Sequence, residues 1–145
     1  MLADYYDGKS SSDLFEARER PFLAPFMNNS AADNTKLKNL FAEVLGERPF
    51  KRNLSVASVD LDGGQVVLFD ESLSNEERVN TLISSAAVPF AFPFEEIDGM
   101  ALVDGSLFTT ISIGDPISRC REEVEKDEDI IVDVIMCYSD VKTIK

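Results

Sequence analysis

The spacing of apolar residues changes several times between residues 34 and 137, from helical to strand-like and back. Intervals of three and four predict a helix over residues 34–45, ended by Gly46, with a buried face made of Leu37, Leu40, Phe41, Val44 and Leu45. Two short apolar runs then predict a strand pair over residues 54–59 and 66–69, joined by the Asp62-Gly63-Gly64 turn. Helices that alternate with strands indicate an α/β fold.

The second half of the chain continues this alternation. Ser74 and Glu77 form a capping box that predicts a helix whose buried face holds Val79, Leu82, Ile83 and Ala86. Asp115-Pro116 predicts the start of a further helix, with Ile117, Cys120 and Val124 turned inward. Residues 130–137 are nearly continuously apolar, which is typical of a strand buried on both faces of a parallel sheet.

Residues 1–33 form an irregular lead-in. A short helix is expected over residues 13–18 with Ser12 as its cap, and prolines interrupt the apolar tract of residues 22–27. That tract is expected to cover a core or to line a pocket. The whole chain of 145 residues fits one domain.

Composition excludes several classes of site. The chain has no histidine and two cysteines, so Ser-His-Asp and Cys-His sites cannot be built and most zinc sites are disfavoured. This leaves carboxylate, hydroxyl, thiol or amine chemistry, or a site with oxygen ligands alone. Neither a metal nor a cofactor is expected. Cys120 and Cys137 are expected to be reduced, packed thiols. The net charge of −13 opposes binding to nucleic acid. No signal peptide is visible and no apolar stretch approaches the ~18 residues of a transmembrane helix, so an intracellular location, cytoplasmic or peripheral to a membrane, is expected.

The segment of residues 97–106 combines a tight Asp98-Gly99 hairpin, a short apolar strand and Asp104 on a second Asp-Gly turn. Open α/β sheets place their sites at the carboxyl ends of strands, so Asp104 is a candidate catalytic base. The chain also contains Asp-Gly at positions 7–8 and 62–63, and such pairs often form ordinary turns. Spacing alone leaves both interpretations of Asp104 open.

Three pieces of sequence together resemble the C-terminal half of a patatin-like phospholipase domain: Ser-Ser-Ala-Ala-Val-Pro-Phe-Ala-Phe-Pro at 84–93, Glu-Glu-Ile-Asp-Gly at 95–99 and Leu-Val-Asp-Gly-Ser-Leu at 102–107. The similarity extends from about Leu37 to about Cys137. It implies a three-layer fold with a mostly parallel sheet and helices on both faces. Members of the family are lipid acyl hydrolases with a Ser-Asp dyad and no catalytic histidine. The resemblance gives Asp104 the role of general base, in a motif of Asp104, Gly105 and Ser106 whose third residue is Gly or Ala in the family.

The family's nucleophilic serine and glycine-rich oxyanion loop lie upstream in the domain, and this chain has no Gly-x-Ser-x-Gly. The expectation is therefore one partial patatin-like domain over residues 1–145, inactive alone, whose missing N-terminal half would complete a site for a phospholipid or acylglycerol ester. Phe90, Phe92 and Phe94, with the 22–27 tract, either line an acyl pocket or belong to the core. The alternative is a non-catalytic module that binds a partner or lipid through an exposed sheet edge and its Phe-rich tracts.

Overall fold

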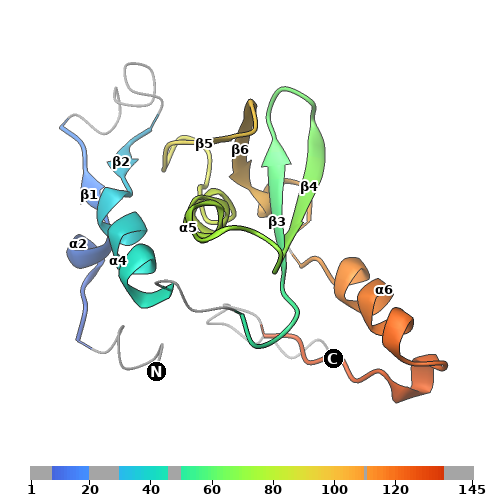
Figure 1. The fold of residues 1–145 in the computed structure, drawn as a ribbon. Helices are drawn as coiled ribbons and strands as arrows, with labels where there is room; N and C mark the ends of the chain where they lie inside the picture. The colour runs from blue at the N-terminus through green and yellow to red at the C-terminus, as the bar shows by residue number, and fades with distance from the viewer. Residues whose placement is uncertain (1–7, 20–29, 46–49, 110, 136–145) are drawn as a thin grey trace, which may run out of the picture. The chain divides into compact units, whose positions relative to one another are not determined.

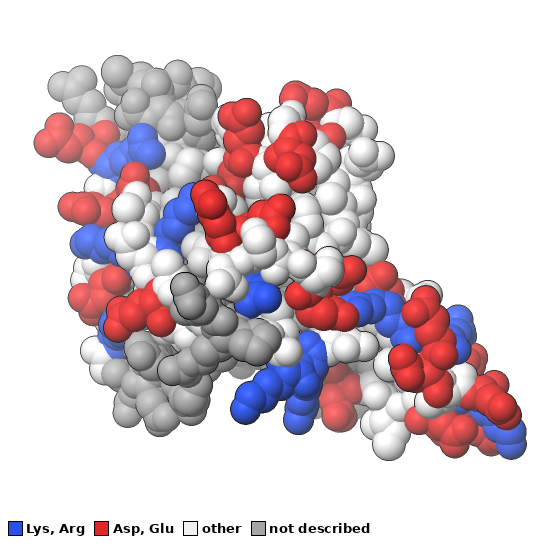
Figure 2. Space-filling view, in the orientation of Figure 1, with Lys and Arg blue, Asp and Glu red and all other residues white. Residues whose placement is uncertain are grey.

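The computed structural model describes residues 8–19, 30–45, 50–109 and 111–135. The chain divides into two compact units, Met1–Ile111 and Ser112–Lys145. The described residues mix helices and strands, which confirms the α/β class at that level. None of the described helices is both long enough and apolar enough to cross a membrane. Acidic side chains predominate over basic ones on the face shown in Figure 2, as the net charge of −13 requires.

The first unit contains a four-stranded sheet (Figure 1). Its strands lie in the order β4 (Gln65–Asp70), β3 (Ser55–Asp60), β6 (Met100–Asp104) and β5 (Glu95–Ile97). All three neighbouring pairs are antiparallel, so the expected mostly parallel sheet is wrong for the described strands. For β3–β4 and β5–β6 the reason is local, because the tight turns at residues 61–64 and 98–99 return the chain directly beside the strand it has just left.

Helix α5 (Asn75–Ser84) covers one face of this sheet. The predicted capping box is confirmed: the Ser74 N–H donates to the Glu77 carboxylate at 2.8 Å, and the Ser74 hydroxyl accepts from the Glu77 N–H at 3.4 Å. The buried residues of the helix are Thr81, Ile83 and Ser84, whereas Ala86, expected on the inner face, is exposed. The core of the unit consists of Leu40, Val56, Val59, Ile83, Ala87, Ile97, Leu102 and Val103.

The opposite face of the sheet is less covered. Side chains alternate along a strand, so Val66 and Leu68 of β4 point away from the side on which Ser58 of β3 meets α5. Both are more than a third exposed, at 40% and 46%. The expected second helical layer is therefore missing over this part of the described sheet.

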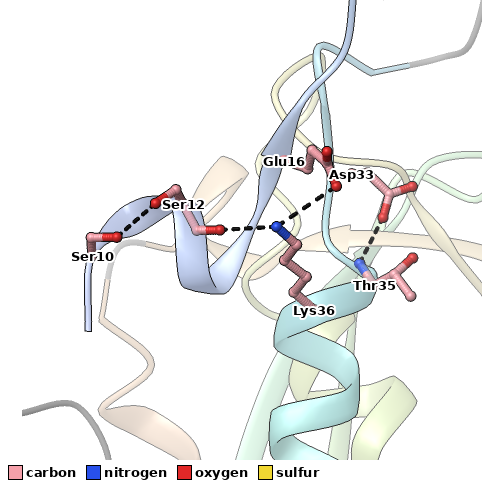
Figure 3. Close-up of polar contacts among 6 residues, drawn as sticks. All are labelled: Ser10, Ser12, Glu16, Asp33, Thr35 and Lys36. Atoms are coloured by element: carbon pink, nitrogen blue, oxygen red, sulfur yellow. Dashed lines mark hydrogen bonds and ion pairs between the residues drawn. The ribbon is translucent and has the colours of Figure 1, made fainter. Parts of the chain in front are cut away.

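The helix predicted over residues 34–45 is confirmed as α4 (Thr35–Leu45). Through α4 the N-terminal elements pack beside α5. Lys36 of α4 donates to the Ser12 carbonyl at 3.1 Å and pairs with Glu16 at 3.7 Å, while the Asp33 carboxylate accepts the Thr35 N–H at 2.8 Å (Figure 3). These contacts join α4 to three short elements: α2 (Ser11–Leu14), β1 (Glu16–Ala17) and β2 (Ala32–Asp33).

The first helix begins earlier than predicted and is shorter. Its cap is Ser10, whose N–H donates to the Asp13 carboxylate at 2.8 Å, rather than Ser12. It ends at Leu14 because the next residues pair with β2 as a strand. The apolar tract of residues 22–27 lies outside the described residues.

The described part of the second unit contains α6 (Gly114–Glu123) and a 3₁₀ turn, η2 (Asp127–Asp129). The helix predicted at Asp115-Pro116 is confirmed, but it has no fully buried residue, and Cys120 is an exposed free thiol rather than a packed one. Residues 130–135 form no strand, and Ile131 and Ile135 are 88% and 92% exposed. The buried strand predicted there is therefore wrong over these residues, because none of the described strands pairs with them; Cys137 lies outside the described residues.

Candidate functional site

Asp104 is the last residue of β6 and the cap of the 3₁₀ turn η1 (Gly105–Leu107). Its backbone N–H donates to the Ala87 carbonyl at 3.0 Å, which ties the end of β6 to the segment that follows α5. Its Oδ1 accepts the Ser106 N–H at 2.7 Å. Among the described residues this is the carboxylate's one hydrogen bond, so Oδ2 is available to accept from a further donor.

The turn after Asp104 requires glycine. A Cβ atom at Gly105 would lie 2.6 Å from the Ala57 carbonyl oxygen, closer than any side chain can be. The Ser85 hydroxyl donates to the same oxygen at 2.7 Å, so the end of α5 and the η1 turn meet at one point of β3. Gly105, Ser85 and Ala87 thus hold Asp104 in place.

The sequence did not reveal these positioning roles of Ala57, Ser85 and Ala87. A signal was present in the run of small residues at 84–87, since small side chains permit the close approach of two backbones. The run could not show that Ala57 is the residue approached, because Ala57 lies far away in the chain and comes close only through the β3–β6 pairing.

Ser58 and Ser84, the buried serines near this turn, are structural. Ser58 lies opposite Asp104 in the β3–β6 register, and its Oγ is 2.8 Å from the Ser84 Oγ. The Ser84 hydroxyl donates to the Thr81 carbonyl at 2.8 Å, so Ser58 is the donor within the pair. Both residues are completely buried, and neither can reach an ester that arrives from solvent.

An apolar pocket of about 490 Å³ includes residues on both sides of the Asp104 turn in the sequence. It is lined by Leu61, Pro89, Phe90, Phe92, Phe94, Val103 and Leu107. All three candidate phenylalanines line it. Phe92 also packs edge-on against Phe15, with ring centroids 5.4 Å apart, whereas Phe90 and Phe94 are exposed and do not belong to the core. No pattern in the sequence indicated that Leu61, Val103 and Leu107 would join them.

Asp104 itself does not line the pocket. Alternation along β6 turns Val103 to the side of the sheet away from Ser58 and Asp104. The carboxylate and the pocket therefore both lie near the end of β6 but on opposite sides of the sheet, and they do not share one cavity.

Phe90 has a left-handed backbone with φ 66°. This conformation is rare for a bulky residue and costs about 1–3 kcal/mol. The backbone around it is held by two hydrogen bonds, from the Ala31 N–H to the Phe90 carbonyl at 2.8 Å and from the Ala32 N–H to the Ala91 carbonyl at 2.9 Å. The fold thus maintains a strained position whose side chain points largely into solvent.

The remaining acidic residues of the described chain give no second site. Asp60 is buried, but its carboxylate accepts the N–H groups of Asp62 and Gly63 at 3.2 and 3.0 Å, which makes it part of the β3–β4 turn. No group of three or more metal-ligating side chains occurs within residues 8–19, 30–45, 50–109 and 111–135.

Comparison with known proteins finds no protein-family model that matches the chain and no curated protein that is significantly similar to it.

Proposed function

We propose that this chain carries the aspartate of a Ser-Asp dyad in a lipid acyl hydrolase that resembles the patatin-like phospholipases. Asp104 is the general base: its Oδ2 accepts the proton of a serine hydroxyl as that oxygen attacks the ester carbonyl, and later returns it to the leaving alcohol. The observation that carries the proposal is the Asp104 turn, in which Ser106, Ala87 and Gly105 fix a partly exposed carboxylate at the end of a strand.

The serine comes from outside these 145 residues. The chain has no Gly-x-Ser-x-Gly. Near the Asp104 turn, Ser58 and Ser84 are buried and bonded to each other, and the Ser85 hydroxyl donates to the Ala57 carbonyl. The oxyanion loop is expected from the same missing segment, and loss of a single oxyanion donor typically costs ~10²–10³ in rate. The chain alone is therefore expected to be inactive.

The substrate is a phospholipid or acylglycerol ester. The apolar pocket beside the turn is large enough for part of an acyl chain, and its lining contains no charged residue. Asp104 and the pocket lie on opposite sides of the sheet, both at the end of β6. An acyl chain bound in the pocket is therefore expected to place its ester at that strand end. No cofactor is needed for this chemistry.

The test reads the coding sequence upstream of Met1 and, where that sequence carries an in-frame Gly-x-Ser-x-Gly, compares the chain with the longer protein. The chain alone is expected to show no turnover of a nitrophenyl ester and no labelling by a serine-directed fluorophosphonate. The longer protein is expected to show both, and Asp104→Asn is expected to lower its turnover by about 10²–10⁴-fold. The matched control is Asp98→Asn, because Asp98 also precedes a glycine, Gly99, in the turn between β5 and β6. Asp98 has φ 52°, which Asn also tolerates.

Equal activity of the Asp104→Asn and Asp98→Asn proteins would overturn the assignment of Asp104. Ester turnover by the chain alone would overturn the statement that the nucleophilic serine lies outside this chain.

The second candidate function, a non-catalytic module that binds lipid or a partner, is favoured by the exposed Phe90 and Phe94. A longer reading frame without Gly-x-Ser-x-Gly would select it.

A further inference from the structure

Four exposed apolar side chains border the pocket of the first unit. Leu61, Phe90, Phe94 and Leu107 all line it and remain 47%, 73%, 39% and 51% exposed; they are called the apolar rim. Single exposed apolar residues are common on proteins, but several around one pocket form a continuous patch. Such patches mark surfaces that bind an apolar partner.

The segments that hold Phe90, Phe94 and Leu107 lack charge, whereas Leu61 lies between two aspartates. Residues 79–94 and 105–114 contain no Asp, Glu, Lys or Arg, in a chain whose charged residues make up 28%. The charged residues next to the rim in the chain are acidic: Asp60 and Asp62 flank Leu61, and Glu95 follows Phe94 and pairs with Lys38 at 2.8 Å. Together with the net charge of −13, this disfavours an anionic partner and fits an uncharged one.

Phe90 is the most exposed residue of the rim and also the most strained. Glycine would adopt its φ of 66° without cost, and the backbone hydrogen bonds to residues 31 and 32 would be kept by any residue. A phenyl ring that is 73% exposed contributes little to the fold. Folding therefore does not explain why a large apolar side chain occupies this position, whereas contact with an apolar phase does.

We infer that the apolar rim docks on an uncharged lipid–water interface, such as the surface of a phosphatidylcholine bilayer, with the Phe90 ring inserted among the acyl chains. This inference deepens the proposed function by naming the surface at which the hydrolase meets its substrate. Vesicle binding needs neither the missing serine nor Asp104, so the two proposals can fail separately.

The test is partition of the full chain into phosphatidylcholine vesicles, measured by flotation. Phe90→Gly is expected to lower the partition coefficient about tenfold or more, because one phenyl ring leaves the apolar phase. Its thermal midpoint is expected to equal or exceed that of the original chain, since glycine relieves the left-handed backbone. Leu107→Ser is expected to weaken partition as well.

The matched control is Ile131→Gly, which removes an even more exposed apolar side chain that does not line the pocket. It is expected to leave partition unchanged. An equal loss in Phe90→Gly and Ile131→Gly, or partition that rises with anionic lipid and falls with salt, would overturn the inference. So would a dimer in light scattering that Phe90→Gly converts to a monomer without any vesicle binding, because the rim would then bind a second copy.

Discussion

Gly105 and the Ala57 carbonyl oxygen approach so closely that a Cβ atom at Gly105 would lie 2.6 Å from that oxygen. The contact lies one residue beyond Asp104 and one before Ser58, the pair that ends the β3–β6 register. It fixes how the chain leaves β6, and hence where the Asp104 carboxylate lies. The Ser85 hydroxyl donates to the same oxygen at 2.7 Å, so a displaced carbonyl would also strain this hydrogen bond.

We expect Gly105→Ala to destabilise the chain by about 1–3 kcal/mol, because an atom is added where the packing leaves no space. Urea unfolding followed by circular dichroism measures this change. Gly114→Ala is the control, since nothing lies within 4 Å of a Cβ at that position. Equal effects of the two substitutions would show that the Ala57 contact does not matter.

The buried hydroxyl pair of Ser58 and Ser84 gives a second prediction. Ser84→Ala leaves the Ser58 hydroxyl without its acceptor in a fully buried place, which is expected to cost about 1–3 kcal/mol of unfolding free energy. The Thr81 carbonyl is not orphaned, because it still accepts the Ser85 N–H at 3.1 Å. The double variant Ser58→Ala/Ser84→Ala is expected to lose less than the sum of the two single variants.

Thr81→Val provides the control for that cycle. The Thr81 Oγ1 is buried and has no hydrogen-bond partner among the described residues, so replacing the hydroxyl by a methyl group removes an unsatisfied polar atom. Its unfolding free energy is expected to stay the same or rise. A loss in Thr81→Val as large as that in Ser84→Ala would indicate a general intolerance of α5 to substitution and would contradict the role given to the serine pair.

Local features of this fold could be predicted from the sequence. The Ser74–Glu77 capping box, the Asp98-Gly99 hairpin and the α4 helix depend on residues a few positions apart, so the information is contained in short segments. The Asp104 turn was located for the same reason. Its neighbour Ser106 supplies the bond to the carboxylate from two residues away.

Features that join distant segments could not be predicted. The antiparallel β3–β6 pairing and the Gly105–Ala57 contact depend on which strands become neighbours, which no short segment specifies. The apolar run at 130–135 has the composition of a buried strand, but burial requires a partner strand, and none of the described strands provides it. Likewise, Leu61 joins the pocket because the β3–β6 pairing places it next to β6, where its N–H donates to the Ala101 carbonyl at 2.9 Å.

The Ser74 cap yields a prediction on α5. Ser74→Ala is expected to lower the unfolding free energy by about 1 kcal/mol, because the first turn of the helix loses a side-chain acceptor. Ser74→Asn keeps an acceptor and is expected to lose much less. Thermal unfolding of the two variants distinguishes a capping effect from a general effect of substitution, and similar losses in both would contradict the capping role.

Glu77 makes the stability of α5 depend on pH. The hydroxyl and the backbone N–H of Ser74 hold the pKa of the Glu77 carboxyl below its ordinary value of 4.5. A group whose pKa is lower in the folded chain than in the unfolded chain stabilises the fold fully above its unfolded pKa and loses that effect as pH falls through the folded pKa. The contribution is therefore present at neutral pH and disappears with acidification below about pH 4.5.

Glu77→Gln removes this titration while it retains a side chain of the same length. The difference in unfolding free energy between the original chain and Glu77→Gln is expected to be largest near neutral pH and to shrink as the pH falls from about 5 to about 3. Urea unfolding across that range measures it. Glu76→Gln, one position earlier in the same helical turn and outside the capping box, serves as the control. If both variants show the same dependence on pH, the effect belongs to the charge at the helix start, and the Ser74–Glu77 bond is not its source.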